Sequence, residues 1–158
     1  MSEILETRFH AVTGLQPING VWATATSTDV VNCSLAKAVH MIINKGAGTT
    51  GTCSITCQAC DDTVPTNTTN IPFYYQACTN TATTDAMTGA PTRVTAFTTT
   101  AGSNQLYMIS VDTDQLAATQ RKYIQFTMTE VTAASVLAGH VILLELQTPR
   151  AITLTQIT

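Results

Sequence analysis

The sequence is organised as short runs in which apolar and polar residues alternate, and most runs end at glycine, proline, asparagine or aspartate. Because successive side chains of a β-strand point to opposite faces, a period of two indicates strands with one buried face. The clearest run is 37–44, where Val39, Met41 and Ile43 share one side. Runs of this kind, repeated at short intervals between turn residues, predict an all-β sandwich or barrel.

The same pattern places the individual strands. We expect strands at 4–12, 21–26, 30–33, 37–44, 51–60, 71–78, 93–98, 105–111, 121–129, 136–146 and 151–158. The runs 37–44 and 51–60 flank the flexible segment 46–48 and are expected to pair as an antiparallel hairpin. Asp112 is expected to cap a single helical turn within 112–118 by accepting a bond from a backbone N–H. The run 136–146 is the most apolar and is expected to form a central strand covered on both faces.

Threonine supplies the polarity of this chain. It makes up about a fifth of the residues, while charged residues are only 11% against about 25% in typical domains. Threonine is β-branched and favours strands, and its hydroxyl gives solubility without charge. A length of 158 residues suits a single domain, 1–158, with or without extended arms.

Composition also excludes two classes of partner. The net charge of −3 and the scattered basic residues argue against nucleic acid, since phosphate neutralisation needs clustered lysine and arginine. No apolar run approaches the roughly 20 residues needed to span a bilayer, so no membrane partner is expected. The first residues lack the pattern of a secretory signal. In a chain made in a reducing cytoplasm, the five cysteines are expected to be mostly free thiols.

No pattern of residues predicts a catalytic, cofactor or metal site. Cys53 and Cys57 face one way on the expected strand and Cys60 the other, so they are expected to be small buried residues rather than zinc ligands. His40 and His140 lie in apolar strands and could meet across a sheet, and we expect each to be a hydrogen-bonded structural histidine. The acidic pairs 61–62 and 112–114 follow strands directly, where aspartate commonly bonds turn backbone. We therefore expect a protein that is not an enzyme.

Large side chains at the ends and in the aromatic segment are the candidates for contact with other proteins. Residues 1–17 and 151–158 are either N- and C-terminal arms that add a strand to a neighbour's sheet, or edge strands of the same domain. Leu5, Phe9 and Val12 would seat an N-terminal arm. Within the segment 73–75, Phe73 and Tyr75 are expected in the core, which leaves Tyr74, together with Trp22, as surface candidates. The interface residues predicted from the sequence are Leu5, Phe9, Val12, Trp22 and Tyr74.

Three stretches resemble a known group of proteins. They are KAVHMIINKGAG from residue 37 with GTCSITCQACDD from residue 51, LYMISVDTDQL from residue 106 with RKYIQF from residue 121, and VILLELQTPR from residue 141. Together, over about residues 30–150, they look like the small head-associated structural proteins of tailed bacteriophages and prophages, the decoration or cement proteins. The resemblance rests on pattern and order rather than on a diagnostic motif.

The resemblance implies a fold, a place and partners. It implies an antiparallel β-sandwich, jelly-roll-like, that binds the outer surface of the major capsid protein shell and stabilises it, after synthesis in the host bacterial cytoplasm. Self-association as a dimer or trimer is expected, because weak contacts repeated by symmetry gain avidity. The alternatives are another virion component, such as a head–tail joining or tail-tube protein, and a glycan- or receptor-binding β-sandwich module.

Overall fold

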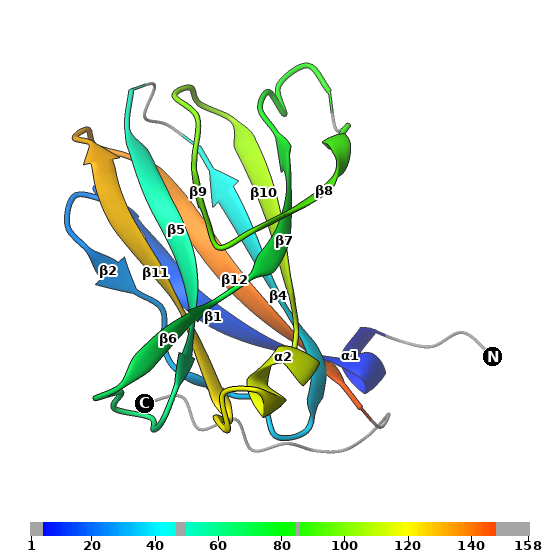
Figure 1. Cartoon of the computed structure of the whole chain (residues 1–158). Helices are drawn as coiled ribbons and strands as arrows, with labels where there is room; N and C mark the ends of the chain where they lie inside the picture. The colour runs from blue at the N-terminus through cyan, green and yellow to red at the C-terminus, as the bar shows by residue number, and fades with distance from the viewer. Residues whose placement is uncertain (1–4, 47–49, 85, 148–158) are drawn as a thin grey trace.

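Two antiparallel β-sheets pack face to face, with the core between them (Figure 1). The computed structural model describes residues 5–46, 50–84 and 86–147. The first sheet has the order β1 (Phe9–Asn19), β12 (Leu137–Leu146), β4 (Ala36–Lys45), β10 (Gln105–Asp112), β7 (Phe73–Cys78) and β8 (Thr88–Val94). The second has the order β2 (Thr26–Ser27), β11 (Tyr123–Thr132), β5 (Thr52–Cys60) and β6 (Thr68–Ile71), with β3 (Val31–Asn32) also on β11 and β9 (Ala96–Thr98) also on β5.

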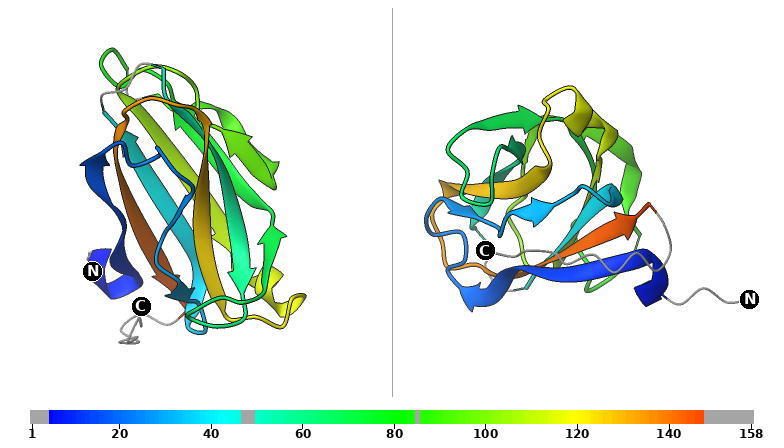
Figure 2. Two further views of the ribbon diagram at one scale, coloured as in Figure 1. Left: turned by 90° about the vertical axis from the view of Figure 1, so that its left-hand side faces the viewer. Right: turned by 90° about the horizontal axis from the view of Figure 1, so that it is seen from below.

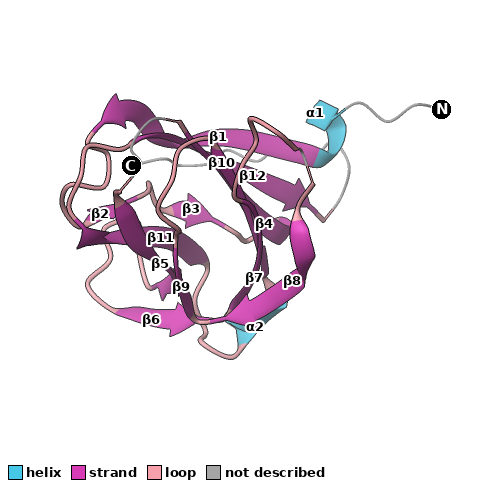
Figure 3. Cartoon of the chain, turned by 90° about the horizontal axis from the view of Figure 1, so that it is seen from above, coloured by secondary structure: helices cyan, strands magenta, loops and turns pink. Residues whose placement is uncertain are grey.

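The strand order is that of a jelly roll. When β1, β2, β4, β5, β6, β10, β11 and β12 are numbered 1 to 8 along the chain, the sheets read 1-8-3-6 and 2-7-4-5. The long strands of the two layers run in similar directions, and the end-on view shows the layers enclosing the core (Figures 2 and 3). The sandwich predicted from the alternating runs is therefore confirmed, and β7, β8 and β9 form an insertion between the fifth and sixth strands of the jelly roll.

The predicted hairpin of 37–44 with 51–60 is wrong. β4 pairs with β10 and β12 in the first sheet, whereas β5 pairs with β11, β6 and β9 in the second. Both strands have one apolar face, and these faces meet across the core through residues such as Met41 and Ile55, which are fully buried. Alternation shows that a strand has an inner face, but it does not show which strand lies beside it.

Of the two alternatives for the N-terminal segment, an arm or an edge strand, the structure shows the edge strand over the residues of β1. Residues 9–17 belong to β1, which pairs with β12 from Phe9↔Glu145 to Asn19↔Leu137, so this part is an edge strand of the same domain. Before it lies the short helix α1 (Leu5–Arg8). The predicted arm at 151–158, and residues 1–4, lie outside the described residues.

Two local predictions are confirmed in atomic detail. The helical turn is α2 (Asp114–Ala117); its N-cap position is Thr113 rather than Asp112, but the Asp112 carboxylate does accept a bond from the Asp114 backbone N–H at 3.0 Å. At the other acidic pair, Asp61 accepts bonds from the side chains of Thr66 and Asn67 and from the Asn67 backbone N–H. These Asn67 bonds, with the Thr66 bond, lower the pKa of Asp61 to about 2. Both aspartates therefore order turns.

A cluster of buried polar groups lies between the sheets. The Trp22 indole N–H donates to His140 Nε2 at 3.2 Å, and the Lys45 ammonium lies 5.7 Å from the centre of the Trp22 ring. Lys45 is buried and donates to the carbonyl oxygens of Gly51 and Thr100. Burial lowers the pKa of Lys45. The two carbonyl oxygens replace part of the hydration that the Lys45 ammonium loses in a mainly apolar core, because a buried charge needs hydrogen-bond partners.

Candidate interaction surface

The side of the first sheet that faces away from the core carries apolar side chains where solvated antiparallel sheets usually carry polar ones. We call this side the outer sheet face and define it by the outward-pointing residues of β1, β12, β4, β10 and β7. Four of its side chains are 40 to 43% exposed: Tyr74, Met108, Leu137 and Val141. Partly buried Ile42, Leu106 and Leu143 lie between them.

Strand pairing arranges these side chains in rows across the sheet. Residues that are directly opposite in an antiparallel pair point to the same face. One row runs Val141, Ile42, Met108 and Gln76, and the next runs Leu143, His40, Ser110 and Tyr74. None of the four side chains of the first row is charged, and Val141, Ile42 and Met108 are apolar, so the middle of the outer sheet face is mainly apolar.

The larger hollows on this face lie beside its apolar row. One has a volume of about 400 Å³ and is bordered by Pro17, Asn44, Leu137 and Val141, over Gly46 and Gly139, which lack side chains. The other has a volume of about 210 Å³ and lies between Phe9, His40, Met108 and Leu143. Ile42 borders both hollows, so the face alternates between projecting side chains and recesses.

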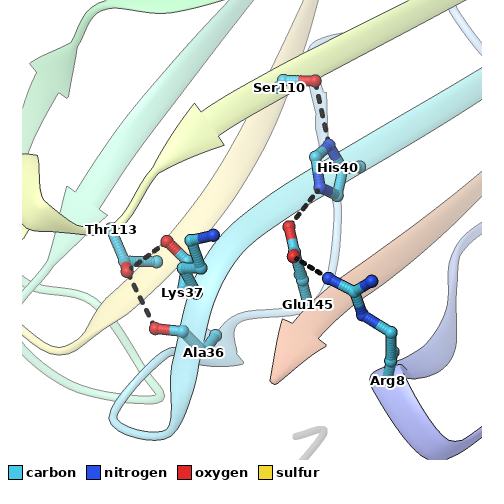
Figure 4. Close-up of polar contacts among 7 residues, drawn as sticks. All are labelled: Arg8, Ala36, Lys37, His40, Ser110, Thr113 and Glu145. Atoms are coloured by element: carbon cyan, nitrogen blue, oxygen red, sulfur yellow. Dashed lines mark hydrogen bonds and ion pairs between the residues drawn. The ribbon is translucent and has the colours of Figure 1, made fainter. Parts of the chain in front are cut away.

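A chain of polar contacts crosses one end of the face (Figure 4). Ser110 Oγ lies 2.9 Å from His40 Nδ1, His40 Nε2 lies 3.6 Å from Glu145 Oε2, and Arg8 donates to Glu145 Oε1 at 3.1 Å. The Phe9 ring packs beside His40 with 6.1 Å between ring centres. The prediction that His40 is a hydrogen-bonded histidine is confirmed, but it does not meet His140, which points into the core from the next strand.

This order of serine, histidine and glutamate resembles the chain of contacts that activates a nucleophile. A hydrolytic serine also needs hydrogen-bond donors for the developing oxyanion. Here Ser110 and His40 lie on β10 and β4, each flanked by strands on both sides, so the neighbouring backbone N–H groups are used in the sheet ladder. We therefore interpret the contacts as an arrangement that holds side chains in place on the face.

The outer side of the second sheet is different in character. Gln58 Oε1 accepts bonds from Gln125 Nε2 at 3.0 Å and from Thr127 Oγ1 at 3.1 Å, and Gln58 Nε2 donates to Asn70. These amide and hydroxyl groups hydrogen-bond to one another. Of the two outer sides of the sandwich, the first is the one that carries an apolar row.

The sheet edges within the described part of the chain are poor templates for an added strand. Pro17 lies in β1, whose register shifts twice, and Pro91 lies in β8, where the register shifts between Tyr75 and Ala77. Each edge of the second sheet is divided between two short strands. Proline and irregular register hinder pairing with another chain, so contact through a face is favoured over strand addition.

The structure separates the five interface residues predicted from the sequence. Tyr74 lies on the outer sheet face, and Phe9 lies half-buried at one end of it. Trp22 is only 2% exposed and Val12 is buried in the core, so the prediction that they form a contact surface is wrong. Leu5 lies in α1, and its side chain is outside what the structure describes.

Sequence reasoning missed most of the face because it expected the run 136–146 to be covered on both sides. Val141 and Leu137 are exposed, since nothing among the described residues packs over β12. The signal was the continuous apolar run itself, which indicates burial on both sides without saying whether the cover belongs to the same chain.

The cysteines do not form a metal site in the described residues. No group of three or more histidine, cysteine, aspartate or glutamate side chains there is arranged to hold an ion. All five thiols are free and buried, and the burial of Cys53, Cys57 and Cys60 is as predicted. Burial raises the pKa of Cys33 and of Cys53 to about 12, which keeps both thiols protonated. Nor does that part of the chain contain a helix of the length and hydropathy that a membrane crossing requires.

Comparisons with known proteins give one structural likeness. No protein-family model matches the chain, and no curated protein matches it. Among solved structures, it is similar to the crystal structure of SPBc2 prophage-derived protein YomS, with 12% sequence identity and a TM-score of 0.46 over 85% of this chain and 92% of that chain. A likeness at that TM-score carries no argument about function.

Proposed function

We propose that this protein is a structural component of a phage virion, a decoration or cement protein that binds the outer surface of the major capsid protein shell and stabilises it. The observation that carries the proposal is the outer sheet face, because its apolar, uncharged middle row indicates a chain that associates with other protein chains. Exposed apolar patches of this kind mark sites of protein association. The resemblance of the sequence to head-associated phage proteins supports the finer assignment to the capsid.

The energetics of such a role agree with what the chain offers. A cement protein gains its effect from many equal contacts on a symmetric shell, so each contact can be modest. The described part of the chain offers surfaces more readily than a reactive group: its five thiols are buried, and Ser110 lies on a strand whose backbone is paired on both sides. We accordingly propose association, and not catalysis, as its activity.

A glycan-binding module is the second candidate, favoured by one observation. Tyr74 is exposed beside Ser110 and pairs with Arg93, an arrangement of aromatic and polar groups that a sugar ring could contact. The hollow there has a volume of only about 60 Å³, far below the roughly 300 Å³ at which small-molecule pockets begin. We therefore rank this function second.

Co-sedimentation tests the proposed function. The full chain is mixed with empty expanded capsids of the phage that encodes it, and the pellet and the capsid melting temperature are measured. We expect saturable binding and a higher melting temperature, because a ligand that binds only the assembled state stabilises it. Absence of the protein from the pellet at tens of micromolar, a concentration where even weak multivalent contacts persist, would overturn the proposal. Equal pelleting with unrelated particles would overturn it too.

A further inference from the structure

We propose that the outer sheet face is a dimer interface, in which a second copy of this chain packs the same face across a two-fold axis. Such an interface is isologous, so one patch must carry both the projections and the recesses that receive them. The outer sheet face has both: Met108 and Val141 project, and the hollows of about 400 Å³ and 210 Å³ lie next to them.

The face is large enough for a stable dimer. Strands lie about 4.8 Å apart and rise about 3.3 Å per residue. The five strands from β1 to β7 hold 11, 10, 10, 8 and 6 residues, so this part of the sheet covers about 700 Å². A stable interface of standard size buries about 800 Å² on each partner. A flat sheet face also suits another sheet face, since sheets pack at about 10 Å across interdigitated side chains.

Electrostatics permit the face to meet itself. Near a two-fold axis each residue lies close to the same residue of the other copy, so an unpaired charge there would be repelled by an identical charge. The row Val141, Ile42 and Met108 carries none. The charges at the end of the face include Arg8 and Glu145, which form an ion pair within one copy at 3.1 Å. Packing two copies therefore requires no uncompensated charge to leave water in the middle of the interface.

A dimer of this form would present two identical sets of the remaining surfaces. If the proposed function holds, those surfaces would let one dimer bridge two coat subunits, which converts the second contact into an intramolecular one. That consequence rests on the proposed function, whereas the dimer itself does not.

The test is the mass of the full chain in solution, measured by sedimentation equilibrium and by light scattering at 1 to 100 µM, a range chosen about the micromolar scale of moderate affinity. We expect twice the 16.8 kDa chain mass for the wild type. Val141→Asp and Met108→Asp each place a carboxylate in the apolar row, so we expect dissociation constants at least ~100-fold higher, because burying an unpaired charge is costly. Thr129→Asp, on exposed Thr129 of the second sheet, is the matched control and should stay dimeric.

Several outcomes would overturn the dimer. One is a wild-type protein that is still monomeric at about 100 µM. Another is a wild-type protein that forms trimers. Another is a dimer that neither aspartate variant weakens while circular dichroism shows both folded. A monomeric wild type whose capsid binding is lost in Val141→Asp would assign the face to the coat instead. If the protein binds capsids as a monomer, the proposed function is supported and the dimer is refuted. If it is a dimer but does not bind capsids, the dimer is supported and the proposed function is refuted.

Discussion

Acidification should destabilise this protein through one buried imidazole. His140 is almost fully buried between the sheets, and its Nε2 accepts the Trp22 indole N–H at 3.2 Å. Its other ring nitrogen, Nδ1, has no hydrogen-bond partner among the described residues. Burial lowers the pKa of His140 from 6.5 to about 4, because a charged ring would lose its hydration inside the core.

The direction and size of the effect follow from this difference. A histidine whose pKa is lower in the folded state binds protons more readily when unfolded, so the free energy of unfolding falls as the pH drops from 6.5 towards 4. With those two pKa values, His140 alone removes about 2 kcal/mol between pH 7 and pH 5. The full difference, reached below the folded pKa, is about 3 kcal/mol. Protonation also removes the acceptor of the Trp22 bond.

Urea unfolding followed by far-ultraviolet circular dichroism at pH 7, 6 and 5 measures this change. His140→Gln keeps an amide oxygen to accept the Trp22 N–H and cannot titrate, so its stability should fall by about 2 kcal/mol less than that of the wild type over this range. His40→Gln removes an imidazole from the outer sheet face and should keep the His140 contribution. Parallel pH profiles for the wild type and His140→Gln would refute the reasoning.

Two further predictions concern the packing of the core. Gly51→Ala should lower the free energy of unfolding by about 1 to 3 kcal/mol, because a Cβ there would overlap Val136 Cγ2. Gly46→Ala, whose Cβ would lie 3.6 Å from the Leu137 carbonyl oxygen, is the matched control, and equal urea midpoints for the two variants would contradict this account. The thiols should react slowly with Ellman's reagent at about pH 8, where a free cysteine is partly ionised, because all five are buried. In urea all five should react at once, and a thiol that reacts rapidly in the native protein would contradict the burial.

Periodicity predicted individual strands much better than their neighbours. The run 105–111 corresponds to β10 and the run 71–78 to β7, because alternation directly records which side chains enter the core. The segment 21–26, predicted as a strand, is mostly turn. The Trp22 side chain lies in the core, where its indole N–H donates to His140. β8 begins before the predicted strand at 93–98 and overlaps only its start, since the residues of β8 are mainly exposed and therefore lack alternation.

The candidate surface was harder to predict than the fold. Tyr74 was correctly placed on the outside because Phe73 and Tyr75 alternate with it and pack into the core, where Tyr75 stacks on Phe97 at 4.2 Å. The rows of the outer sheet face join residues such as Val141 and Met108, which are far apart in the sequence. Their assembly depends on sheet order, and local pattern does not encode sheet order.

The pairing of β1 with β12 sets a condition on how the molecule is made. Phe9 pairs with Glu145, and among the described strands β1 lies beside β12 alone. On the ribosome, the first strand must wait unpaired until nearly the last described residue has left the exit tunnel. Contacts so distant in sequence slow folding to milliseconds or longer. An unpaired, apolar first strand is therefore exposed throughout synthesis, and a chaperone that binds nascent chains would be expected to raise the yield of folded protein.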